Sequence, residues 1–308
     1  MLFGVQLGTY DPGESGNYWD KLKEVALACE AGGLDSVWFA DHFMWRDEDD
    51  PDAERPVLEC FVALAALAAV TERVRLGALV VGVPYRNPAL LAKMSTTLDI
   101  VSRGRSIIGL GAGWHKLEFD SYDWPFGTVG ERMDKLEDAV QIVHRMLTER
   151  PATFKGKHYS IDEALNDPPA IQKPRPPIMI GGGGEQRTLK LVAQYADYCN
   201  VFGSPDEIAH KFDVLRKHCE TVVRPFEEIT LSNHGSIMIA RDEAELQAKK
   251  EQFPDFRGLA GTPDQVIERC REYVAVGSTY MTFSMPDIAD LEPIRLFGET
   301  VVPALADA

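Results

Sequence analysis

The chain has 308 residues, 45% of them hydrophobic, and a formal net charge of −16. This length fits one large α/β domain or two medium ones, and the apolar content suffices for a sizeable core. The acidic balance argues against general binding to nucleic acids or anionic membranes, because their phosphate groups would repel the chain.

Short β-branched runs alternate with longer runs of helical periodicity along the chain. The predicted strands, in chain order, are 2–8, 34–40, 73–81, 105–111, 177–181, 197–202, 229–240 and 280–284. The predicted helices that follow them are 18–33, 57–71, 88–102, 130–149, 184–195, 205–222, the pair 242–252 and 262–276, and 288–304. Asn87 and Pro88 are typical of a helix start, as an N-cap and a proline in the first turn.

Eight strands, each followed by at least one helix, predict an α/β fold, a (β/α)8 TIM barrel formed by residues 1–308 as a single domain. The strands read as continuous apolar runs, which is typical of strands buried on both faces. A doubly wound open sheet is the alternative. We favour the barrel because eight successive units fill it without remainder.

Three segments exceed a minimal barrel. Residues 41–56 and 112–129 follow the second and fourth strands, so we expect them as insertions on the C-terminal face, where barrel enzymes build their sites. Residues 150–176 include a predicted hairpin with its turn at Lys155 and Gly156. The charged run 46–54 is expected to be a solvated loop.

Targeting signals are not apparent. The N-terminus lacks a basic region followed by a long apolar one, and the apolar stretch 60–70 is too short to span a bilayer. The five cysteines form no Cys-x-x-Cys motif, and no metal-ligand cluster is apparent among the seven histidines. We therefore expect a cytoplasmic protein with reduced core thiols and no metal site.

A run of four glycines, Gly181, Gly182, Gly183 and Gly184, separates a predicted strand from a predicted helix. Backbone N–H groups at a helix N-terminus attract anions, and glycine lets an anion touch the backbone itself. The surrounding segment carries four cations against one acid: Lys173, Arg175, Arg187 and Lys190 against Glu185. We predict phosphate binding here. The structural alternative is a tight turn that needs positive φ, for which one or two glycines would suffice.

Asp41 and His42 follow the second strand, at the expected C-terminal mouth of the barrel. A histidine there is well placed to transfer a proton or to bind a cofactor, and a loop histidine bonded to its neighbours is the alternative. The nearby aromatic residues form either a wall for a flat ring or part of the core: Trp38, Phe43 and Trp45. A second glycine cluster at the same mouth permits close backbone approach: Gly109, Gly111 and Gly113.

Together, segments 33–43, 73–119, 130–147 and 176–202 resemble the bacterial luciferase-like superfamily, and within it the coenzyme F420-dependent oxidoreductases. The segments occur in order, and the similarity covers most of residues 2–285. The resemblance implies a (β/α)8 barrel with a flavin or deazaflavin ring at its C-terminal mouth. It also implies a homodimer, which is common in the family.

The resemblance also assigns residues. His42 matches the position beside the reactive centre of the ring, and Asp41 the position next to it. Leu79 and Val80 fall where members often carry a non-prolyl cis peptide bond that bulges against the ring. The remaining matches are a segment that contacts the cofactor, Gly111, Ala112 and Gly113, and the region that receives its phosphate, Gly181 to Gly184.

One departure concerns the proton donor. In the sugar-phosphate dehydrogenase branch, a glutamate that serves as an acid directly follows the second glycine of the fourth-strand motif. Trp114 occupies that position here, and Glu118 lies four residues further on. The resemblance therefore does not support sugar-phosphate oxidation, and it leaves the proton donor open.

We expect an F420-dependent oxidoreductase that moves a hydride between the deazaflavin and a small organic substrate, with His42 as the catalytic residue. The nearest alternative is an FMN-dependent monooxygenase that uses reduced flavin and dioxygen. A barrel that binds a cofactor without turnover and a phosphosugar isomerase or lyase are the others.

Overall fold

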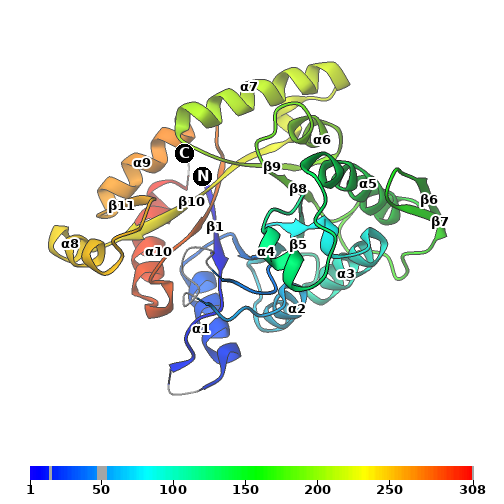
Figure 1. Ribbon diagram of the computed structural model, residues 1–308. Coiled ribbons are helices and arrows are strands. Elements are labelled where there is room, and N and C mark those ends of the chain that lie inside the picture. The colour runs from blue at the N-terminus through cyan, green and yellow to red at the C-terminus, as the bar shows by residue number, and fades with distance from the viewer. Residues whose placement is uncertain (14–15, 47–53, 307–308) are drawn as a thin grey trace.

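The computed structural model describes residues 1–13, 16–46 and 54–306, so most of the charged run 46–54 lies outside the described residues. Eight parallel strands form a closed barrel in these ranges (Figure 1). They are β1 (Leu2–Leu7), β2 (Ser36–Phe39), β3 (Arg75–Ala78), β5 (Ser106–Gly111), β8 (Ile178–Gly181), β9 (Tyr198–Phe202), β10 (Thr230–Ile239) and β12 (Tyr280–Ser284). The last strand pairs with the first, with Gly4 opposite Thr282, and this closure confirms the TIM barrel over the open sheet.

Helices surround the barrel, as the alternation of elements predicts. They are α1 (Tyr18–Ala31), α2 (Cys60–Val70), α3 (Pro88–Val101), α5 (Val129–Thr148), α6 (Thr188–Tyr195), α7 (Pro205–Val222), α8 (Glu243–Gln252), α9 (Pro263–Ala275) and α10 (Glu292–Ala304). Asn87 caps α3 as predicted, since its side chain accepts a hydrogen bond from the N–H of Ala89. Short 3-10 turns cover Val83–Tyr85, Phe226–Glu228 and Ile288–Asp290.

Three predicted elements differ from the structure for identifiable reasons, and the other predicted boundaries lie within three residues of the observed ones. The strand expected at 73–81 is divided into β3 and β4 (Val81–Gly82), with a cis peptide bond between Leu79 and Val80. The helix expected from 184 begins only at Thr188, because the glycine run continues as a turn. The helix expected from 288 is a 3-10 turn followed by α10, since Leu291 takes a left-handed conformation with φ of 64°.

Two short elements escaped prediction. The insertion at 112–129 contains α4 (Lys116–Ser121), and β11 (Leu259–Gly261) extends the sheet beside the second half of β10. Elements of three to six residues carry too few periods to be recognised in a sequence.

The predicted hairpin is present as β6 (Ala152–Lys155) and β7 (Ser160–Ala164), an antiparallel pair outside the barrel beside α5 (Figure 1). Asp138 of α5 holds it, because its carboxylate accepts hydrogen bonds from the N–H groups of His158 and Tyr159.

Apolar side chains between strands and helices form the core, and all five cysteines are buried and free, as predicted. Trp38 is also fully buried, where its indole N–H donates to Ser36, so it belongs to the core and not to the mouth. None of the helices in the described ranges is long and apolar enough to cross a bilayer. Within the same ranges, His, Cys, Asp and Glu residues form no group suited to a metal ion.

Candidate active site

A cavity of about 290 Å³ opens at the C-terminal mouth of the barrel. The predicted site residues that line it are Asp41, His42, Leu79, Val80, Gly111, Ala112, Gly113, Gly181 and Gly182. Five further residues complete the lining: Gly82, Tyr85, Trp114, Asn200 and Phe202. Gly183 and Gly184 do not line it and lie further along the same turn. The fold thus gathers segments from five strands, far apart in the sequence, around one space.

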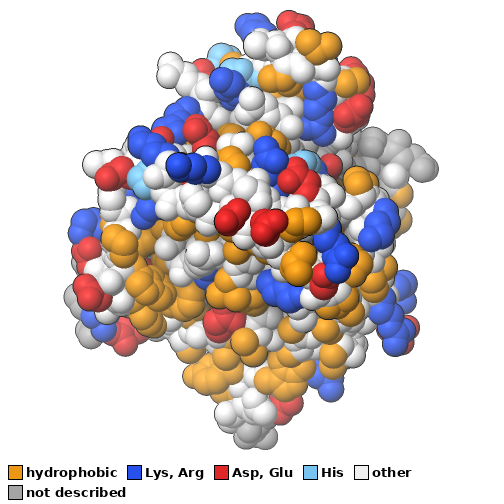
Figure 2. All heavy atoms as spheres, turned by 90° about the vertical axis from the view of Figure 1, so that its right-hand side faces the viewer, with side chains coloured by type: hydrophobic (Ala, Val, Ile, Leu, Met, Phe, Trp, Pro, Cys, Tyr) orange, Lys and Arg blue, Asp and Glu red, His pale blue; other side chains and the backbone are white. Residues whose placement is uncertain are grey.

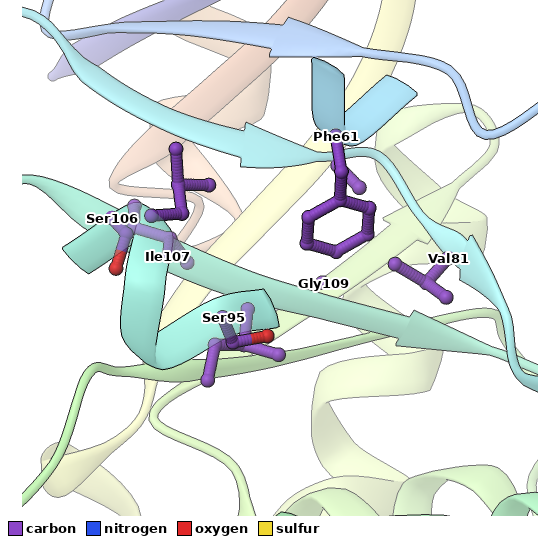
Figure 3. A pocket seen from close by; sticks show the side chains of 9 residues that line it. Phe61, Val81, Ser95, Ser106, Ile107 and Gly109 are labelled. Atoms are coloured by element: carbon purple, nitrogen blue, oxygen red, sulfur yellow. The ribbon is translucent and has the colours of Figure 1, made fainter. Parts of the chain in front are cut away.

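A second cavity, behind β3 and β5, is much smaller, at about 10 Å³ (Figure 3). Phe61, Val81 and Ile107 enclose it, and the buried hydroxyl of Ser95 has no hydrogen-bond partner among the described residues. This volume admits about one water molecule, and its lining holds no titratable side chain. The mouth cavity is the candidate site because nine of the predicted site residues line it.

The Leu79–Val80 bulge forms one wall of the mouth cavity. Val80 packs over the glycines of the neighbouring strands, since a Cβ on Gly111 or Gly181 would lie 2.5 or 3.0 Å from its methyl groups. A Cβ on Gly109 would lie 2.0 Å from the carbonyl oxygen of Ala78. These glycines thus serve first to seat the bulge, and they bring an apolar surface to the cavity.

Asp41 presents an unsatisfied oxygen at the cavity. Its Oδ2 accepts hydrogen bonds from the guanidinium of Arg86 at 2.7 Å and from the N–H of Gly82 at 3.1 Å. Its Oδ1 is buried and has no partner among the described residues. Burial raises the pKa of this carboxyl, while Arg86 opposes the rise. A buried acceptor of this kind suits an N–H donor on a ligand.

Asn200 presents a second such oxygen. Its side-chain NH2 donates to the hydroxyls of Ser232 at 3.0 Å and Thr282 at 3.2 Å, which fixes the amide so that Oδ1 is its remaining polar atom. This Oδ1 is buried without a partner in the described ranges. Our sequence analysis did not identify Asn200, although one amide in the apolar strand 197–202 is a signal for it.

His42 is held by Glu118. Its Nδ1 lies 3.1 Å from Glu118 Oε2, and the same carboxylate accepts from the N–H groups of Phe43 and Met44 and from the hydroxyl of Tyr85. An ionised carboxylate only accepts, so Nδ1 carries the proton that forms this bond. In the neutral ring, Nε2 is then the nitrogen left to meet a ligand in the cavity.

Glu118 itself is fully buried and does not line the cavity. Burial raises the pKa of its carboxyl, but the hydrogen bonds from His42, from Tyr85 and from the backbone outweigh burial and hold that pKa below its ordinary value. Burial and the neighbouring Glu118 raise the pKa of the Tyr85 hydroxyl, so it remains a donor. Glu118 therefore orients His42, and it is not the proton donor that faces a substrate.

The glycine turn differs in detail from its prediction. Arg187 pairs with Asp134 and Glu137 of α5, and Arg175 pairs with Asp197 at the opposite end of β8. Neither serves the turn. Lys211 of α7 does lie beside it, because a Cβ on Gly183 would be 3.5 Å from its Cε, and its ammonium group pairs with Glu185.

The family follows from a comparison with known proteins. Residues 1–257 match the model of a family described as luciferase-like monooxygenase. The chain belongs to the luciferase-like family. It is thus a flavin- or F420-dependent oxidoreductase of that family, as the segments resembling it predicted.

One luciferase-like relative is the F420-dependent glucose-6-phosphate dehydrogenase of Kineococcus radiotolerans, which is 36% identical over 92% of this chain and 93% of its own length. Two solved structures share the fold at lower identity. An F420-dependent secondary alcohol dehydrogenase with an F420-acetone adduct superposes with a TM-score of 0.82, at 20% identity over 99% of both chains. A type II Baeyer-Villiger monooxygenase from Pseudomonas putida, in complex with FMN, superposes with a TM-score of 0.78, at 17% identity over 98% of both chains.

Proposed function

We propose that this luciferase-like chain is an F420-dependent oxidoreductase that moves a hydride between the deazaflavin and a small organic substrate. The observation that carries the proposal is the mouth cavity, where an apolar bulge, two unsatisfied buried oxygens and the His42–Glu118 pair meet. The 36% identical relative named as F420-dependent adds support.

The cavity suits a flat heteroaromatic ring. Leu79, Val80 and Ala112 offer it apolar surface, and the free oxygens of Asp41 and Asn200 accept from ring N–H or O–H groups. We assign the glycine turn, with Lys211 beside it, to the cofactor phosphate. When bound, the deazaflavin supplies a two-electron hydride transfer.

His42 handles the proton. Hydride transfer to a polarised C=C or C=O bond must be balanced by one proton delivered to the other atom of that bond. When its imidazole is protonated, His42 delivers that proton from Nε2, and in the reverse reaction Nε2 takes the proton up. Glu118 keeps its hydrogen bond to Nδ1 in both directions.

We also propose that the chain forms the homodimer expected above. Sedimentation velocity tests this, because a dimer has twice the chain mass of 34.2 kDa.

Anaerobic oxidation of reduced F420, followed by absorbance with a panel of ketones and unsaturated carbonyl compounds, tests the proposal. We expect oxidation that depends on a substrate and needs no dioxygen. Turnover with FMN and dioxygen alone would instead support the monooxygenase and overturn the F420 assignment. Cofactor binding without turnover of any kind would favour the barrel that only binds.

A further inference from the structure

Two large aromatic side chains stand exposed at the cavity mouth. Trp114 is 62% exposed and Phe202 58% exposed, and both line the cavity. They follow β5 and end β9, the strands that flank β8 on either side. Exposed aromatic surface around a binding cavity marks a site for apolar ligands.

Both side chains are supported from behind. Trp114 packs edge-to-face on His42 and His115, with ring centroids 5.7 and 4.9 Å away, and Trp45 stacks on His115 at 5.5 Å. Phe202 packs edge-to-face on His234 at 5.5 Å. Because their neighbours hold them, these rings lose little further freedom when a ligand binds.

The cavity is poorly suited to a phosphate on the substrate. Within the described part of the chain, its lining contains no Lys or Arg. Two arginines near the lining are engaged elsewhere: Arg86 with Asp41 and Glu59, and Arg132 with the carbonyl oxygens of Gly113 and Gly127. Lys211, which also pairs with Glu185, lies beside the glycine turn that we assign to the phosphate of the cofactor and not of the substrate. Removing a dianion from water without a cationic partner is strongly unfavourable.

We propose that the substrate is uncharged and largely apolar, held between Trp114 and Phe202 above the cofactor, and that a phosphorylated sugar does not bind in this site. The inference rests on the proposed function, because a bound cofactor would occupy the part of the cavity lined by Asp41 and Asn200 and leave the aromatic side chains to the substrate. It separates this chain from the relative named for glucose 6-phosphate, despite their 36% identity.

Calorimetric titration with a neutral aromatic ketone, 2-acetonaphthone, and in parallel with glucose 6-phosphate, tests this substrate class. Each titration is made with and without F420, on the wild type and on Trp114→Ala and Phe202→Ala. Tyr18→Ala is the matched control, since Tyr18 is an exposed aromatic outside the cavity. Circular dichroism checks that each variant is folded. Because two aromatic positions are substituted separately, the test still decides the proposal if one variant does not fold.

We expect saturable binding of the ketone, weaker by about tenfold in each cavity variant and unchanged in the control, because each loses one buried aromatic contact. Glucose 6-phosphate should give no saturable signal. Saturable binding of glucose 6-phosphate, no binding of the ketone, or ketone affinity equal in all four proteins would overturn the proposal. The titrations without F420 decide the substrate class even if F420 fails to bind, an outcome that would contradict only the proposed function.

Discussion

His42 illustrates how one side chain acquires a role from its partner. Its position at the end of β2 is readable in the sequence, but its orientation depends on Glu118, which lies 76 residues away in the chain. Such a contact has no local signature, because it arises from the folding of the insertion after β5 against the loop after β2. The sequence predicted the histidine, therefore, and left the reach of Glu118 open.

A double-mutant cycle tests that partnership. We expect His42→Ala to lower kcat by about 100-fold and Glu118→Gln by about tenfold, with F420 affinity retained in both. The double variant should be no slower than His42→Ala alone, because Glu118 acts through His42. Losses that multiply would show instead that Glu118 acts independently, and circular dichroism controls for the fold.

His234 gives the stability a predictable pH dependence. Burial lowers the pKa of this histidine from 6.5 to about 4, and its Nδ1 lies 3.1 Å from the Thr282 hydroxyl. Between pH 6.5 and about pH 4, His234 binds a proton in the unfolded chain but not in the folded chain, so the free energy of unfolding falls as the pH falls. The loss due to His234 is about 2 kcal/mol from pH 7 to pH 5.

Urea unfolding of the wild type and of His234→Asn at pH 7 and pH 5 measures this difference. The variant should lose about 2 kcal/mol less between the two pH values, since every other titrating group is common to both proteins. An equal loss in both would mean that His234 is protonated in the folded state at pH 5.

At the scale of elements, the bulge between β3 and β4 depends on the glycines of β5. Gly109→Ala should lower the free energy of unfolding by at least about 2 kcal/mol, because its Cβ would lie 2.0 Å from the backbone oxygen of Ala78. Gly235→Ala is the matched control within β10, where the nearest atom is a Met281 methyl at 3.5 Å. A similar cost at both positions, measured by urea unfolding, would show that loss of glycine itself and not the close approach matters.

The glycine turn permits one clean substitution. Gly182 has φ of 122°, and a Cβ on Gly184 would lie 2.8 Å from the Thr188 hydroxyl, whereas Gly183 has only ordinary contact with Lys211. Gly183→Val should therefore fold with a melting temperature close to that of the wild type, yet bind F420 at least about tenfold more weakly. Gly130→Val is the control, because it makes the same change of residue outside the cavity. Unaltered F420 affinity in Gly183→Val would show that the turn does not bind the cofactor phosphate.

The element order was predictable because buried parallel strands and amphipathic helices leave clear periodic signals. Periodicity did not predict the division of residues 73–81, since Val80 and Val81 read as a continuation of the strand; the family resemblance pointed to a bulge at Leu79 and Val80, and the structure shows its packing against Gly109 and Gly111. Phe202 escaped the prediction of the site for a related reason. As the last residue of a strand, it looked like core and is in fact exposed.

At the scale of the whole molecule, the chain carries a net charge of −16. Figure 2 shows acidic and basic side chains interspersed on the face that carries the β6–β7 hairpin, with apolar side chains gathered towards the lower half of the view. The barrel brings together at one end residues from 41 to 202, and this convergence produces a cavity that no single segment contains. The lining residues of the mouth cavity therefore decide together which cofactor binds.

Equilibrium titration of the protein with F420, followed by the fluorescence of the cofactor and compared with FMN under the same conditions, tests the central claim most directly. We predict saturable binding of one F420 per chain, with FMN bound more weakly. Saturable binding of FMN with no response to F420, or no binding of either cofactor, would contradict the assignment.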